Sequence, residues 1–201
     1  MRFGAYDKAI SPLRLVLVST TPRQDMMEDL VECLNRGAVR YPGAQKTFGS
    51  GLTIREHLVC SSVSEYEQRI EAFVRSNARK DTDIALVYLP KTGDSDDVNH
   101  PYFRVKGLLV QEGLGSQMVD EETVVKPQWR VLNLALNMYA KAGYAPWVLD
   151  EAIADVDLFI GLSSSQIKRN GQIMRMMAYV NVFDAYGRWQ FYQGDSMAFS
   201  F

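Results

Sequence analysis

Four polar side chains in the middle of this 201-residue sequence have types and spacings suited to binding an anion: Tyr102, Lys106, Gln117 and Lys141. Tyr102 and Lys106 are four residues apart, so on a helix they lie on one face in successive turns. A lysine ammonium is a point charge suited to a phosphate, and a tyrosine offers a hydroxyl donor or a ring on which a base can stack. Taken alone, a tyrosine and a lysine at this spacing are more often solvent-exposed residues without a ligand. The prediction of an anion site therefore depends on the neighbouring residues.

Gln117 follows a Gly-x-Gly sequence, Gly113 to Gly115, which predicts a turn after the helix that carries Tyr102 and Lys106. Glycines let a loop approach a ligand closely, and an amide presented from that loop can donate to an anionic oxygen. We therefore expect Gln117 to reach the same place as Lys106.

Lys141 lies at the end of a predicted helix, with Asn137 and Asn133 one and two turns before it on roughly the same face. The alternative is that these side chains are simply solvent-exposed, since lysine is favoured near helix C-termini by the dipole. Polar groups that converge from two helices and one loop are what a 5′-phosphate pocket requires. Further candidate contacts are Ser116 and Arg130.

The first half of the chain predicts strands that alternate with helices. Apolar runs at residues 13–19, 56–62 and 83–90 have the length and composition of buried strands. Amphipathic segments at 20–37 and 64–80 predict helices, and residues 38–54 predict a loop. This alternation indicates an α/β domain with a Rossmann-like parallel sheet flanked by helices.

The second half continues this pattern and then changes. A helix from Pro101, a short strand at 116–119 and a long helix at 126–143 complete the first domain, residues 1–153, of which 1–12 are linker-like. From residue 157 onward the period becomes that of antiparallel strands around a turn at 184–187. We expect residues 154–201 to be the N-terminal portion of a second domain.

Composition excludes several classes of protein. A formal net charge of −2 gives no sign of a polybasic nucleic-acid binder, so an anion site must be built locally. Two cysteines and two histidines are too few for a disulfide framework or a typical zinc site. His57 and Cys60 are three residues apart in a predicted strand and face opposite sides, which argues against a catalytic Cys–His pair. Without a signal-like or membrane-spanning run, we expect a soluble, cytoplasmic protein.

The order of four sequence blocks resembles the MID domain of prokaryotic Argonaute proteins running into the start of their PIWI domain. The blocks are Y-x-x-x-K at 102–106, GLGSQMV, LNLALNMYAKAG before PWVL, and DLFIGLSSS at 157–165. Residues 1–100 contribute only a compatible α/β pattern. The resemblance therefore implies a MID domain over 1–153 and the first strands of an RNase H-like PIWI domain over 154–201.

The resemblance implies a site for the 5′ end of a short guide strand at Tyr102, Lys106, Gln117 and Lys141. In the family the tyrosine stacks on the first guide base, and the lysines and glutamine hold its phosphate, often with a divalent cation. It implies a bound Mg²⁺ near Gln117 as a candidate cofactor. The implied partners are a short 5′-phosphorylated guide RNA or DNA, a complementary target, expected to be DNA, and the remaining PIWI segment or an associated effector protein.

The same resemblance places Ser163 where the PIWI domain has its first catalytic aspartate, after the sequence FIGL. A serine hydroxyl cannot replace an ionised carboxylate as a bridging ligand for two magnesium ions. The family's other acidic residues would lie beyond Phe201. We therefore expect a guide-anchoring protein of nucleic-acid interference that does not cleave, and no enzyme activity.

Two other functions fit parts of the sequence. A Rossmann-like sheet can bind a free nucleotide or metabolite at the carboxyl ends of its strands. Alternatively, the antiparallel strands at 157–201 can complete their sheet with another polypeptide, because uncovered strand edges are sticky.

Overall fold

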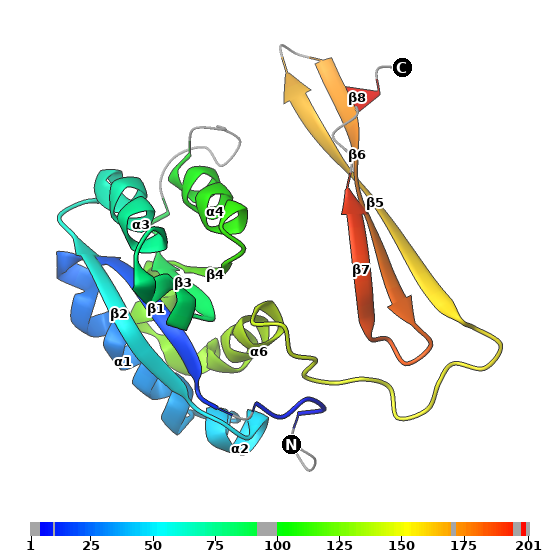
Figure 1. Ribbon diagram of the computed structural model, residues 1–201, viewed down its shortest axis with the longest axis horizontal. Helices are drawn as coiled ribbons and strands as arrows, with labels where there is room; N and C mark the ends of the chain where they lie inside the picture. The colour runs from blue at the N-terminus through cyan, green and yellow to red at the C-terminus, as the bar shows by residue number, and fades with distance from the viewer. Residues whose placement is uncertain (1–4, 10, 92–99, 170–171, 195–197, 200–201) are drawn as a thin grey trace. The chain divides into compact units, whose positions relative to one another are not determined.

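The computed structural model describes residues 5–9, 11–91, 100–169, 172–194 and 198–199. The chain forms two compact units, Met1–Pro146 and Trp147–Phe201, and each is described by itself (Figure 1).

The first unit is built on a parallel four-stranded sheet in the order β2-β1-β3-β4. The central strand β1 has almost no exposed residue, because both faces of the sheet are covered, and this explains its unbroken apolar sequence LRLVLVST. The Rossmann-like parallel sheet predicted from the sequence is confirmed. The strands are β1 (Leu13–Thr20), β2 (Leu52–Cys60), β3 (Ile84–Tyr88) and β4 (Gly115–Val119).

Helices cover both faces of this sheet (Figure 1). The α-helices are α1 (Gln24–Arg36), α2 (Ala44–Phe48), α3 (Tyr66–Val74), α4 (Pro101–Gln111), α5 (Glu121–Val125) and α6 (Val131–Lys141). The 3₁₀ turns are η1 (Thr21–Arg23), η2 (Val63–Glu65), η3 (Asn77–Asp81) and η4 (Pro127–Trp129).

Two apolar cores lie on either side of the sheet. Leu15 and Leu17 of β1 point to the core that α1, α2 and α6 cover, whereas Val16 and Val18 point to the core under α3 and α4. This follows from the alternation of side chains along a strand. The polar edge strand β4 is thus sandwiched between α4 on one face and α6 on the other.

Three sequence-based boundaries in the first half are wrong. The predicted loop at 38–54 contains α2, which ends at Gly49 in a left-handed conformation with φ 83°. The strand predicted at 56–62 begins earlier, at Leu52. Its start was missed because Thr53 and Arg55, on this edge strand, are exposed and polar and so resemble loop residues. The helix predicted at 64–80 ends at Val74.

The long helix predicted at 126–143 is also divided. Lys126 adopts φ −130° and ψ 62°, outside the helical region, and Pro127 then opens the 3₁₀ turn η4. A residue before proline is disfavoured in the α conformation, which explains the break. The helix α6 therefore begins only at Val131.

The second unit is an antiparallel sheet, as the sequence predicts. β6 lies between β5 and β7 and also pairs with β8. Its strands are β5 (Leu158–Arg169), β6 (Gln172–Asp184), β7 (Trp189–Gly194) and β8 (Ala198–Phe199).

The predicted turn at 184–187 joins β6 to β7. Asp184 accepts hydrogen bonds on its Oδ1 from the backbone N–H groups of Tyr186 and Arg188, and Gly187 supplies the positive φ of 74°. This local chemistry explains why the turn was predictable.

Residues before β5 are joined to the same turn. The backbone N–H groups of Leu149 and Ile153 donate to the carbonyls of Tyr186 and Ala185. The structure therefore divides the chain after Pro146, whereas the sequence suggested a division after residue 153.

Within the described residues, no helix is both long and apolar enough to cross a membrane. Cys33 and Cys60 are free thiols.

Candidate functional site

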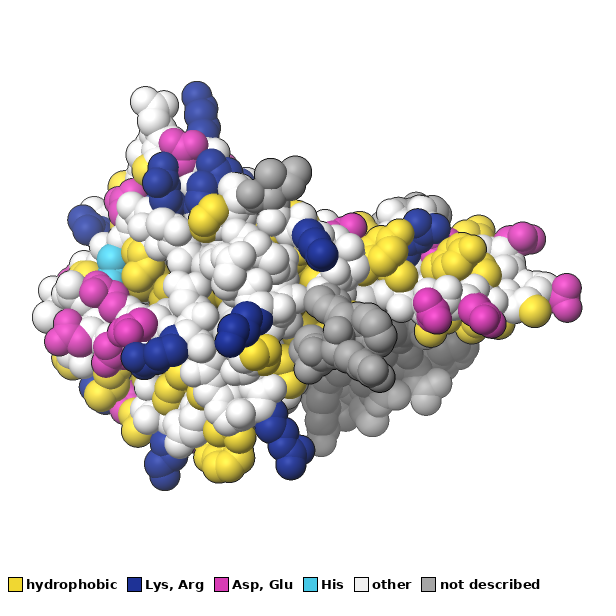
Figure 2. Space-filling view, turned by 90° about the horizontal axis from the view of Figure 1, so that it is seen from below, with side chains coloured by type: hydrophobic (Ala, Val, Ile, Leu, Met, Phe, Trp, Pro, Cys, Tyr) yellow, Lys and Arg dark blue, Asp and Glu magenta, His cyan; other side chains and the backbone are white. Residues whose placement is uncertain are grey.

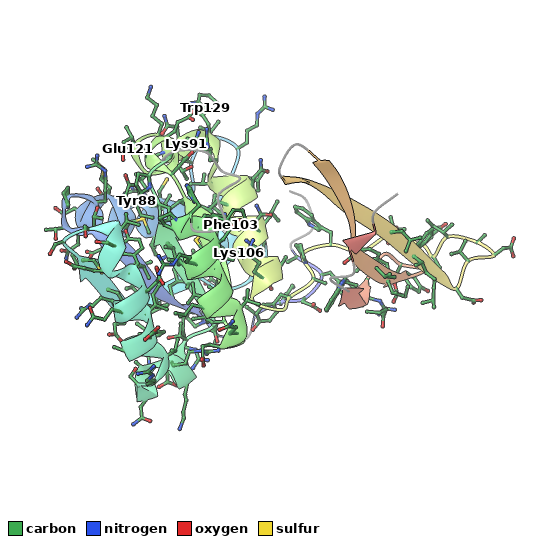
Figure 3. The ribbon with its side chains drawn as sticks, turned by 90° about the horizontal axis from the view of Figure 1, so that it is seen from above. Tyr88, Lys91, Phe103, Lys106, Glu121 and Trp129 are labelled. Carbon is green, nitrogen blue, oxygen red and sulfur yellow. The ribbon has the colours of Figure 1, made fainter. Side chains whose placement is uncertain are left out.

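The predicted site residues gather around the outer edge of β4. Lys106 comes from α4, on one face of the sheet, and Lys141 from the end of α6, on the other face. Gln117 lies between them in β4, the short strand predicted at 116–119, which pairs with β3. Figure 3 shows Lys106 and Phe103 together on α4.

α4 places Tyr102 and Lys106 as their spacing predicts. The helix starts at Pro101, and the His100 side chain caps it by accepting a hydrogen bond from the Tyr102 N–H, 3.1 Å away. Lys106 Nζ donates to Tyr102 Oη over 3.0 Å and lies 5.1 Å from the centre of the same ring. The tyrosine therefore holds the ammonium near its own hydroxyl.

Lys141 is held by β4. Its ammonium donates to the backbone carbonyl of Ser116 and to Oε1 of Gln117, each over 2.8 Å. The amide nitrogen of Gln117 donates in turn to the carbonyl of Met118, 2.8 Å away. Both ends of the Gln117 amide are thus engaged within the protein.

The two glycines before Gln117 have different roles. Gly113 has a positive φ of 62° and makes the turn after α4. Gly115 lies against the end of α6, where an added Cβ would be 2.6 Å from the carbonyl oxygen of Lys141. The close approach that Gly115 permits is therefore between α6 and β4, and this contact brings Lys141 to Gln117.

The electrostatics of this edge favour an anion. Desolvation of the ammonium and repulsion from Lys106 lower the pKa of Lys141. The two lysines are thus close enough to repel one another, and a bound anion would relieve that repulsion.

A cleft of about 850 Å³ opens between α4, β4 and α6. Lys106 and Lys141 do not line it themselves, but Tyr102 and Gln117, to which they donate hydrogen bonds, do. This volume lies in the upper part of the range of about 300–1,000 Å³ found for small-molecule sites, so the cleft has room for more than a phosphate. The predicted site residues that line it are Tyr102, Gln117, Arg130, Asn133 and Asn137.

Ser116 is placed differently from the other candidates. Its side chain is buried on the face opposite Gln117, and its Oγ has no hydrogen-bond partner. It contributes its backbone carbonyl, which accepts from Lys141. The alternation of side chains along β4 separates these two neighbours.

The far end of the cleft is a network that the sequence did not suggest. Asp120 caps α5 by accepting from the N–H and hydroxyl of Thr123, and it pairs with Lys91 over 3.0 Å. Arg130 lies 3.7 Å from Asp120 and also pairs with Glu122. The only sequence signal for this network is the Asp-x-x-Thr spacing of a helix cap.

Acid should weaken this capping network. Burial alone would raise the pKa of Asp120, but hydrogen bonds from Thr123 and Lys91 outweigh it and lower the pKa to about 2. A carboxyl group whose pKa is lowered by folding stabilises the fold at pH values above its pKa in the unfolded chain. This stabilisation is lost as the pH falls from about 4 to about 2.

We expect Asp120→Asn to lower the free energy of unfolding by about 2 kcal/mol at pH 7. In urea titrations the difference from wild type should shrink as the pH falls below about 4. A difference independent of pH would show that the charge of Asp120 contributes nothing.

A second polar network lies on β1 and β2. Ser19 Oγ is 2.8 Å from His57 Nε2, and His57 Nδ1 is 2.9 Å from Glu28 Oε1. This order of groups is that of a hydrolase triad, but Ser19 is fully buried and cannot meet a substrate. The network therefore ties α1 to the edge strand β2.

Removing His57 alone should lower the free energy of unfolding more than removing His57 and Ser19 together. His57→Leu leaves the buried Ser19 hydroxyl unsatisfied, and we expect a loss of about 1–3 kcal/mol of stability. Adding Ser19→Ala should recover part of that loss in a double-mutant cycle followed by urea unfolding. Strictly additive losses would contradict the coupling.

In the second unit, Ser163 lies in β5, paired with Tyr179 of β6. The register shifts between Ser163 and Ser164, so a β-bulge follows the position that the resemblance equates with a catalytic aspartate. The Ser163 side chain lies outside the described part of the structure.

The surface gives no broad basic face on the side shown in Figure 2, where the coloured residues mix basic, acidic and apolar side chains. Within the described residues, no cluster of three or more His, Cys, Asp or Glu could hold a metal ion.

Comparisons with known proteins identify the relatives of this chain. No family model matches it. Over 115 residues, 55% of the chain, it is 30% identical to the protein argonaute of Aquifex aeolicus. Over 206 aligned positions, 90% of the chain, it is 26% identical to the protein argonaute of Cereibacter sphaeroides. The chain spans 16% and 26% of the lengths of these curated relatives.

Solved structures with the same fold are prokaryotic Argonautes. The structure of the Aquifex aeolicus Argonaute with externally bound siRNA aligns with 92% of this chain and 26% of the Aquifex chain, with a TM-score of 0.61 and 21% identity. The Methanocaldococcus jannaschii Argonaute with guide DNA aligns with 96% of this chain and 27% of its own chain, with a TM-score of 0.60 and 15% identity. The Marinitoga piezophila Argonaute with 5′-OH guide RNA aligns with 97% of this chain and 31% of its own chain, with a TM-score of 0.56 and 11% identity. The resemblance to prokaryotic Argonautes, and the fold that it implies, are thereby confirmed.

Proposed function

Starting from this kinship with the prokaryotic Argonautes, we propose that the chain anchors the phosphorylated 5′ end of a short guide strand and supports recognition of a complementary target. The phosphate would lie at Lys106 and Lys141, and the first base would stack on Tyr102 within the cleft. The MID domain would correspond to the first unit and the start of the PIWI domain to the second.

The observation that carries the proposal is the placement of two lysines on the helices that flank β4, with Lys106 held on Tyr102 and Lys141 held on Gln117. They come from two helices on opposite faces of the sheet, yet Lys106 contributes to lowering the pKa of Lys141. Like charges that repel one another favour the binding of an anion, which would relieve the repulsion. The adjoining cleft, with Tyr102 in its wall, offers the aromatic surface that a base requires.

The relatives support a nucleic-acid ligand but leave its 5′ end open. Solved neighbours hold siRNA, guide DNA or a 5′-OH guide RNA, according to their descriptions. One fold thus accommodates more than one guide, so the end chemistry must come from side chains. Here two lysines favour a phosphate over a hydroxyl.

We propose further that the chain does not itself cleave the target. Ser163 takes the position of the first catalytic aspartate in the resemblance, and a neutral hydroxyl is a poor bridging ligand for two metal ions. The relatives' names do not decide this point, so a cleavage assay with a guide and a complementary strand is required. A specific cut in the target would contradict the proposal.

The deciding measurement compares binding of a 5′-phosphorylated strand with that of its 5′-hydroxyl twin, in both RNA and DNA. We expect the phosphorylated strand to bind at least about 100-fold more tightly, since two charge-assisted contacts are lost without it. Equal affinities would refute the proposal.

A free-nucleotide site is disfavoured by the structure of the sheet. Ligands of Rossmann-like sheets bind where the strand order reverses, here at the ends of β1 and β3. At that place Arg23 donates to both carboxylate oxygens of Glu121, each over 2.7 Å, and Tyr88 Oη also donates to Glu121. Figure 3 labels Tyr88 and Glu121. An internal ion pair thus takes the position where a phosphate would bind.

The length of the bound strand distinguishes a guide-strand site from a free-nucleotide site. If the chain holds a guide, a phosphorylated strand of about a dozen nucleotides should bind more tightly than the matching 5′-mononucleotide, because backbone contacts add to the end contacts. Equal binding of the two ligands would favour a nucleotide sensor.

A further inference from the structure

We propose that this site holds its anion without a divalent cation, because the ammonium of Lys141 takes the place that the cation would need. The inference rests on the proposed 5′-phosphate site and departs from the Mg²⁺ that the family resemblance implies. It concerns the oxygen atoms that surround Lys141.

A Mg²⁺ ion requires oxygen ligands at about 2.0–2.1 Å in octahedral geometry, usually with one or two carboxylates. Two protein oxygens lie at the Lys141 ammonium group, Gln117 Oε1 and the carbonyl of Ser116. Both already accept hydrogen bonds from Lys141 Nζ, each over 2.8 Å. A metal ion that used these oxygens would have to compete with the ammonium group already bound to both of them.

Carboxylates do not replace these oxygens. Among the described residues of the first unit, the carboxylate that lines the cleft is Asp120, at its far end. Asp120 is occupied by Thr123 and Lys91, which hold it as the cap of α5. With Lys141 in place, these oxygens therefore suit an ammonium group and not a divalent cation.

The balance of charge agrees. A phosphate monoester carries about −1.5 to −2 charges at pH 7, and the ammonium groups of Lys106 and Lys141 supply two positive charges. Adding Mg²⁺ would leave an excess of positive charge beside two lysines that already repel one another.

In this arrangement Gln117 is a positioning residue. Its Oε1 holds the Lys141 ammonium, and its nitrogen is committed to the carbonyl of Met118. Its effect on phosphate binding is therefore exerted through Lys141.

The test measures binding of the phosphorylated and hydroxyl strands in millimolar MgCl₂ and in EDTA at matched ionic strength. We expect a preference for the phosphorylated strand that differs by less than about twofold between the buffers. A preference seen only with Mg²⁺ would overturn this inference and leave the proposed function intact. Absence of a preference in both buffers would overturn the proposed function as well.

A variant provides the converse test. Lys141→Met frees Gln117 Oε1 and the Ser116 carbonyl, so we expect weaker binding in EDTA that Mg²⁺ restores several-fold. Lys80→Met, which removes an exposed lysine from η3 ahead of β3, is the matched control and should behave as wild type. Unchanged affinity of Lys141→Met in EDTA would show that its ammonium does not act as the cation.

The positioning role of Gln117 has its own readout. Gln117→Met removes one acceptor from the Lys141 ammonium, so phosphate binding should be lost at a lower pH than in wild type when the pH is raised. Lys80→Met should leave that pH profile in place. A Gln117→Met profile that coincides with wild type would contradict the role.

Discussion

Replacing Lys106 and Lys141 together by methionine should abolish the preference for a 5′-phosphorylated strand. Methionine keeps most of the apolar stem of each lysine and removes only the charge. Hydrogen bonds to charged groups contribute about 1.5–3 kcal/mol each, so losing two should weaken binding about 100-fold or more. Competition between the phosphorylated and hydroxyl strands at physiological salt measures the effect.

The matched control is the double variant Lys46→Met/Lys80→Met. These exposed lysines lie on α2 and η3, and removing them changes the net charge by the same amount. The control should retain the preference, because long-range charge contributes little beyond a Debye length of about 8 Å. If both double variants lose affinity equally, attraction by net charge and not a built site explains the binding.

Gly115→Ala should both destabilise the first unit and impair the site. The new Cβ would lie 2.6 Å from the Lys141 carbonyl oxygen, a distance that forces the end of α6 away from β4. Overpacking of this kind costs about 1–3 kcal/mol. Displacement of Lys141 from Gln117 by about 1 Å should weaken phosphate binding by an order of magnitude or more.

Gly107→Ala is the natural comparison for this variant. Gly107 lies in α4 beside Lys106, and an added Cβ there meets nothing within 4 Å. Alanine should stabilise the helix by about 0.5–1 kcal/mol and leave binding unchanged. Urea unfolding and strand binding measured on both variants separate a local steric effect from a general effect of replacing glycine. Wild-type binding by Gly115→Ala would show that the α6–β4 contact is dispensable.

The sequence was most informative where structure is local. Unbroken apolar runs predicted β1 and β3, because both faces of a parallel sheet are buried. The contact between Tyr102 and Lys106 was predictable because both lie on one helix. The edge strand β2 and the break at Pro127 were misjudged, since exposed polar residues and a helix-like pattern concealed them.

By itself the sequence determined the α/β class, the turn at Asp184, the family resemblance and the choice of the four residues that we propose for the site. Only the tertiary structure decided how those residues meet. Lys106 and Lys141 lie 35 positions apart in the chain, and it is the packing of α4 and α6 against opposite faces of β4 that brings both to this strand. The alternation along β4 turned Gln117 toward Lys141 and buried Ser116, because successive side chains of a strand point to opposite faces.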